Sequence, residues 1–100
     1  MKKDIILEVF GYLKSKGIVT GESEFSEQWL GASEGYMRKL RSTQSEPSLG
    51  AVAICGSRLM NAAEQLSTLP RYQHLAEQLT AMSSKCRALV DADSVEFDLA

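Results

Sequence analysis

The chain has 100 residues, which is enough to bury one hydrophobic core but not two. Apolar residues make up 44% and charged residues 24%, the balance of an ordinary globular domain, and no apolar run approaches the roughly 18 residues of a membrane span. The net charge of −2 is unusual for a nucleic-acid binder, but the bases concentrate in residues 1–45, which carry seven Lys/Arg against six Asp/Glu.

The N-terminal sequence and the cysteines indicate a cytoplasmic protein without a metal centre. Residues 1–4 lead into a short apolar run that Glu8 interrupts, so we expect no signal peptide and no membrane partner. Cys55 and Cys86 are the only cysteines, and a single histidine accompanies them. We therefore expect two buried free thiols, with no metal and no cofactor.

Two helices are predicted in the first third of the chain. Apolar residues recur at helical spacing over residues 4–16, and Gly17 is well placed to end that helix in the left-handed conformation. The next helix is expected at residues 23–30, with Thr20 or Ser23 as its N-cap.

A glycine then interrupts an otherwise continuous apolar periodicity. Gly31 is expected to stop the second helix, and Ser33 to cap a third helix over residues 33–42. After a polar loop, a fourth helix is predicted to reach about Ser67, with Pro47 in its first turn, where its missing N–H costs nothing.

The last third of the chain carries a heptad seam and an acidic tail. The seam consists of Tyr72, Leu75, Leu79, Met82, Cys86 and Leu89. It can pack on the fourth helix of the same chain or meet its symmetry mate in a two-fold homodimer, and we expect some of both. Residues 94–99 alternate with period two, which predicts a short extended segment or a disordered tail.

These elements define an all-α, five-helix domain with a helix-turn-helix and a long C-terminal helical hairpin. We assign residues 1–67 to a helix-turn-helix domain, with the helix-turn-helix proper at 23–42. Residues 68–90 form the C-terminal helix for packing or dimerisation, and residues 91–100 form the acidic tail.

Residues 25–59 resemble the phage-repressor and Cro-type helix-turn-helix superfamily. Residues 30–33, Leu-Gly-Ala-Ser, match the end of its first helix, the turn and the opening of its recognition helix. Met37 and Leu40 fill its core positions four and seven residues after that serine, and residues 47–49, Pro-Ser-Leu, match the start of its next helix. The resemblance extends over residues 22–60.

The resemblance implies two sets of DNA contacts. Positions that read bases in this family correspond to Glu34, Gly35, Arg38 and Ser42. Positions suited to phosphate contacts are Ser23, Tyr36, Lys39, Arg41, Gln44 and Ser45. Arg38 can donate twice to a guanine or be a solvated surface arginine, and Glu34 can accept from a cytosine or simply favour a helix N-terminus.

We therefore expect a dimeric, sequence-specific DNA-binding transcriptional regulator, with double-stranded DNA as its partner and no small-molecule ligand. The alternative is a helix-turn-helix-derived protein-interaction module, an adaptor or phage-type inhibitor that does not bind DNA. Glutamates around residues 22–34 favour this alternative. An enzyme is not expected, because His74 is isolated and no glycine-rich phosphate loop follows a strand.

Overall fold

The computed structural model describes the backbone of residues 2–99 and the side chains of residues 2–92. This part of the chain is all-helical and contains no strand, which confirms the predicted fold class. Its α-helices are α1 (Lys2–Ser15), α2 (Glu22–Trp29), α3 (Tyr36–Thr43), α4 (Leu49–Leu66) and α5 (Gln73–Leu99). A short 3-10 helix, η1 (Pro70–Tyr72), connects α4 to α5.

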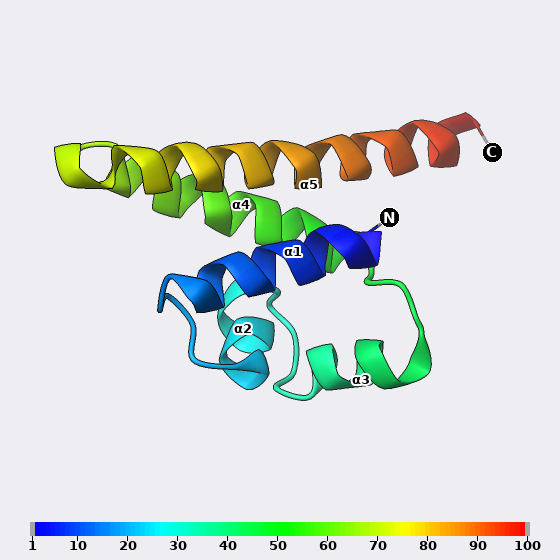
Figure 1. Cartoon of the computed structure of the whole chain (residues 1–100). Coiled ribbons are helices and arrows are strands. Elements are labelled where there is room, and N and C mark those ends of the chain that lie inside the picture. Colours follow the sequence, from blue (N-terminus) through cyan, green and yellow to red (C-terminus); the bar gives the residue numbers. More distant parts are fainter. Residues whose placement is uncertain (1, 100) are drawn as a thin grey trace.

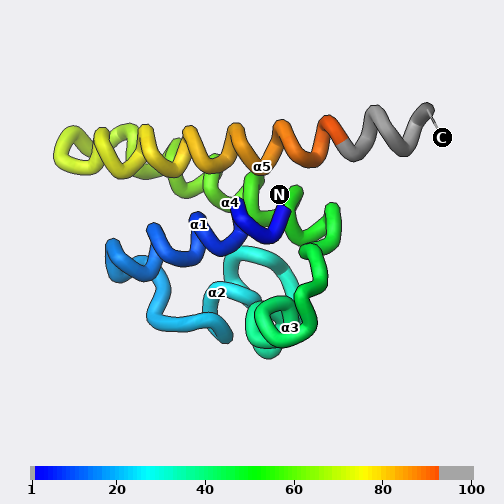
Figure 2. Tube along the Cα trace, turned by 45° about the vertical axis from the view of Figure 1, so that its right-hand side comes forward, coloured from blue at the N-terminus to red at the C-terminus, as the bar shows by residue number. Residues whose placement is uncertain are grey.

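Helices α4 and α5 form an antiparallel hairpin along one side of the molecule (Figure 1). Helix α1 packs along this hairpin, and α2 and α3 lie on the side away from α5 in both views (Figures 1 and 2). The long C-terminal hairpin predicted from the sequence is therefore confirmed, with α5 of 27 residues extending beyond α4 of 18 residues.

Close contact between α4 and α5 depends on a glycine. A Cβ placed on Gly56 would lie 3.0 Å from the Cβ of Cys86, which is tighter than ordinary packing allows. The Ser83 hydroxyl, which is buried, donates a hydrogen bond of 2.7 Å to the Gly56 carbonyl oxygen. Gly56 and the Ser83 hydroxyl together fix the close approach of α4 and α5.

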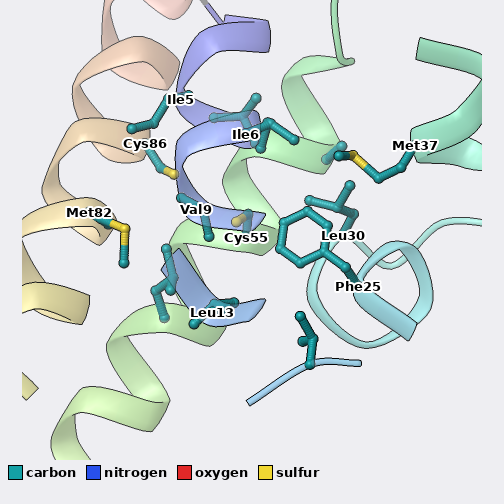
Figure 3. Packing of buried hydrophobic residues seen from close by; sticks show 14 of the residues in the cluster. Ile5, Ile6, Val9, Leu13, Phe25, Leu30, Met37, Cys55, Met82 and Cys86 are labelled. Carbon is teal, nitrogen blue, oxygen red and sulfur yellow. The ribbon is translucent and has the colours of Figure 1, made fainter. Parts of the chain in front are cut away.

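One hydrophobic core joins all five α-helices. Val9 of α1, Phe25 of α2 and Met37 of α3 are completely buried, and Figure 3 shows them converging on α4. Burying one such side chain contributes about 1.5–3 kcal/mol to folding. Because this cluster draws on α1 and α5 together, residues 1–67 and 68–90 share a single core.

The predicted ends of the first two helices are confirmed. Gly17 has a φ of 73°, and its N–H donates to the Lys14 carbonyl while that of Ile18 donates to the Leu13 carbonyl. This pair of bonds is the Schellman cap that a glycine after a helix favours. Gly31, which follows α2, also takes the left-handed conformation, with a φ of 62°.

The predicted N-cap of α2 is wrong. The capping position is Gly21, which has no side chain to donate or accept, and Ser23 already lies inside the helix. Instead, the Glu24 carboxylate accepts a hydrogen bond of 3.1 Å from the backbone N–H of Thr20. A carboxylate in the first turn also favours the positive end of the helix, so it stabilises the loop and the helix start together.

Helix α3 begins at Tyr36, three residues later than predicted, and Ser33 is not its cap. The Tyr36 N–H donates to the Ser33 carbonyl, which makes residues 33–36 a tight turn ahead of the helix. Six residues therefore separate α2 from α3, a longer connection than the sequence indicated.

Two further boundaries differ from the prediction. The N-cap of α4 is Ser48, whose hydroxyl accepts from the Ala51 N–H at 3.1 Å, so Pro47 lies before the helix and is buried there. Helix α5 continues past residue 90, where the C-terminal helix was expected to end, and its last residue is Leu99. The extended segment or disordered tail expected at residues 94–99 falls on residues whose side chains the structure does not describe. The side chains of the acidic tail beyond residue 92 lie outside the described residues.

Candidate nucleic-acid interface

A buried serine connects the two helices of the helix-turn-helix. Ser26 is fully buried in α2, and its hydroxyl accepts a hydrogen bond of 3.1 Å from the backbone N–H of Met37 in α3. The same hydroxyl donates to the Glu22 carbonyl at 2.8 Å. Since the first N–H groups of a helix have no partner inside it, α2 supplies the cap that α3 lacks.

The two faces of α3 differ sharply. Met37 and Leu40 are buried on the core side, whereas Arg38, Lys39 and Ser42 are exposed. Neither Arg38 nor Lys39 has an ion-pair partner in the described part of the chain. The outward face of α3 therefore offers two cations that no described side chain neutralises.

The third cation of α3 is already engaged. Arg41 makes an ion pair with Glu22 of α2, in which its terminal nitrogen lies 2.8 Å from the carboxylate oxygen. Both side chains are partly exposed, so this pair contributes little to stability. While this ion pair is intact, Arg41 is not free to contact a phosphate.

The predicted base-reading positions fall on two different elements. Arg38 and Ser42 are on α3, but Glu34 and Gly35 lie in the turn before it, where Glu34 is exposed and Gly35 is half-buried. A Cβ built on Gly35 would lie 4.0 Å from the guanidinium of Arg38. The turn therefore stands directly beside the arginine without crowding it.

The predicted phosphate contacts are also dispersed. Tyr36 is partly buried, and its hydroxyl oxygen accepts from the Ser48 N–H at 3.0 Å, so it already has a structural role. Ser23 is exposed in the first turn of α2, and the N-cap position expected for it is taken by Gly21. Gln44 and Ser45 are exposed beyond the end of α3, where Gln44 takes the left-handed conformation.

Two basic residues outside the predicted contact set hold α2 and α3 in place. Arg58 of α4 donates to the carbonyls of Glu27 and Gln28 at the C-terminal end of α2, at 3.1 and 2.5 Å. Lys3 of α1 donates to the Leu40 carbonyl near the end of α3, at 2.8 Å. Cations at helix C-termini are favourable, but nothing in the sequence indicates which distant helix a base will reach.

The predicted dimer seam is inside the monomer. Leu79, Met82 and Cys86 are buried against α4 and α1 of the same chain, and Leu75 and Leu89 pack against the same core. Tyr72 is half-buried in η1. Leu79, Met82 and Cys86 are therefore covered within one chain, whereas Tyr72, Leu75 and Leu89 remain half-buried.

The two cysteines are buried, free and adjacent across the α4–α5 contact. The hydrogen bond with Cys86, together with burial, raises the pKa of the Cys55 thiol far above its usual range. The two thiols are packing groups of the core. In the part of the chain that the structure describes, no cluster of three His, Cys, Asp or Glu side chains forms that could hold a metal.

The fold and this site define a class: an all-helical domain in which a helix-turn-helix stands against a long helical hairpin, with a basic face on its second helix. No described helix is both long and apolar enough to cross a membrane. The chain belongs to the family of unknown function DUF6626, whose sequence pattern matches residues 6–98. No curated protein and no solved structure matches it.

Proposed function

We propose that the protein is a sequence-specific DNA-binding regulator of transcription that lays α3 in the major groove of double-stranded DNA. One observation carries the proposal: α3 is fixed on its inner side by the core and by Ser26, and its outer side presents Arg38 and Lys39, which pair with no described residue. An α-helix with its side chains is about 10–12 Å across, which suits insertion into a major groove about 12 Å wide.

Each exposed group has a distinct role in this proposal. Arg38 donates twice to one guanine, which supplies base discrimination. Lys39 contacts a phosphate and contributes affinity without sequence preference. Gly35 lets the backbone before α3 approach the duplex closely, and Glu34 beside it accepts from a cytosine.

The test is a binding titration at about 50 mM salt with random duplex and with DNA from upstream of the protein's own gene. Arg38→Ala should weaken binding to the preferred site by about 1–3 kcal/mol and relax specificity at one base position. Lys39→Ala should weaken binding to all duplexes and lower the salt-dependence slope by about one.

Arg71→Ala is the matched control, because it removes one exposed positive charge from η1, on an element separate from the helix-turn-helix. It should leave both the affinity and the salt slope nearly unchanged. Absence of binding to either duplex at low salt would contradict the proposal, and so would equal losses in the Arg38→Ala and Arg71→Ala variants.

One observation favours the second candidate, a protein-interaction module that does not bind DNA. Residues 20–46 carry five glutamates against three bases, and the Glu22–Arg41 ion pair neutralises one of those bases. An acidic surface of this kind repels phosphates and suits a basic protein partner. This candidate predicts no binding to any duplex in the titration above.

A further inference from the structure

The side of the hairpin that α1 leaves uncovered is hollowed. A groove of about 410 Å³ lies between α4 and α5, and all its lining residues belong to these two helices. Its apolar lining includes Val52, Ala53 and Met60 from α4 and Val90 from α5. Ala53 is exposed and Met60 and Val90 are half-buried, so apolar surface remains open to solvent there.

Two opposite charges border this groove on α5. Arg87 and Asp91 both line it, both are exposed, and neither has an ion-pair partner among the described residues. They are four residues apart, so they stand one turn apart on the same face of the helix. Their side chains nevertheless form no ion pair with each other.

We propose that this groove is the interface of a two-fold homodimer, in which α5 of each copy seats in the groove of the other. In an antiparallel pair of identical helices, a two-fold axis beside residue 89 brings Arg87 of one copy opposite Asp91 of the other. The same operation repeats the contact in reverse, as every two-fold interface requires. The surface is therefore self-complementary in charge, and the apolar lining of the groove lies beside the two ion pairs.

This interface differs from the heptad seam, because the seam faces the core whereas the groove opens on the other flank of α4 and α5. It also leaves α3 free, since no residue of α1, α2 or α3 lines the groove. The inference does not depend on DNA binding. A dimer that does not bind DNA would support this inference and contradict the proposed function, whereas a monomer that binds DNA would do the reverse.

The test is the mass of the full chain by sedimentation equilibrium, with charge reversals at the two positions. The unmutated protein should be a dimer at micromolar concentration. Arg87→Asp places two acids opposite each other at both contacts, and Asp91→Arg places two bases there, so each variant alone should raise the dissociation constant by about 100-fold or more.

Restored dimerisation in combined variants distinguishes a direct Arg87–Asp91 contact from a general effect of changed charge. An equimolar mixture of the Arg87→Asp and Asp91→Arg chains should form a heterodimer, because every contact across the axis then joins opposite charges. The double variant R87D/D91R should dimerise by itself for the same reason. Arg71→Asp, an equal charge change on η1, should stay dimeric, and circular dichroism should show all variants fully helical.

A monomeric unmutated chain would overturn the proposal and leave the groove to a different occupant. Single variants that remain dimeric would place the interface elsewhere. Failure of the mixture to associate, with both single variants folded and monomeric, would refute the reciprocal pairing of Arg87 with Asp91.

Discussion

Replacing Ser26 with alanine tests whether one hydroxyl group stabilises the packing of α3 against α2. The variant removes the acceptor for the Met37 N–H, which is buried at the start of α3 and has no partner within its own helix. A buried N–H left unsatisfied costs about 1–3 kcal/mol. The second bond of the hydroxyl, to the Glu22 carbonyl, adds little, because that carbonyl lies on the ordinary ladder of α2.

We therefore expect Ser26→Ala to lower the free energy of unfolding by about 2 kcal/mol, measured by urea denaturation. For a domain of this size, this corresponds to a fall in melting temperature of about 8–16 °C. Ser23→Ala is the matched control, because it makes the same change on an exposed position of the same helix and should be neutral or slightly stabilising. Equal stabilities of the two variants would refute the role given to this hydrogen bond.

Other features of the structure give measurable expectations. Gly31→Ala should destabilise by about 2 kcal/mol in urea denaturation, because its φ is 62° and a Cβ would lie 3.1 Å from a methyl carbon of α4. Gly17→Ala, with a similar φ but no atom within 4 Å, should cost only about 1 kcal/mol, and the opposite order would contradict the crowding argument. If the protein binds DNA, Glu22→Gln should free Arg41 for a phosphate, raise affinity for every duplex by about 10-fold at low salt and steepen the salt slope by about one. Both thiols are buried, so a disulfide reagent should label them in the native protein far more slowly than in the urea-unfolded chain, and the raised pKa of Cys55 should make that thiol the slower of the two.

The sequence was informative wherever a single residue type decides the local backbone. Gly17 and Gly31 each take the left-handed conformation at the end of a helix, and few residues other than glycine do so without strain. The apolar spacing of α1, α4 and α5 likewise predicts which faces are buried, since one stripe must cover the core.

The sequence was misleading where tertiary contacts replace local capping. A serine before an amphipathic run usually caps it, yet α3 is capped by Ser26 from the neighbouring helix, and Ser33 stays in the turn. A serine at residue 26, between Phe25 and the polar residues that follow, reads as part of a solvated face. Its burial depends on how α2 packs against α3, and the spacing of apolar residues along the sequence does not reveal that packing.

Charges were hardest to place. Arg41 looks free in the sequence, but it pairs with Glu22 nineteen residues away. Arg58 sits in an apolar helix and reads as a solvent-facing base, whereas it holds the end of α2 from thirty residues further along the chain. Such partners depend on where the backbone brings two helices together, so the candidate site could be located from the sequence but its electrostatics could not.

The packing of α1 on the last helix has a consequence for biosynthesis. The Glu8 carboxylate lies 2.9 Å from the ammonium of Lys85, a partner 77 residues later, and Val9 beside it shares the buried cluster with Met82. At a translation rate of about 5–20 residues per second, α1 waits several seconds for the chain that covers it. Until α5 has been synthesised and can pack, the part of the apolar stripe of α1 that contacts it stays open to chaperones or to a neighbouring nascent chain.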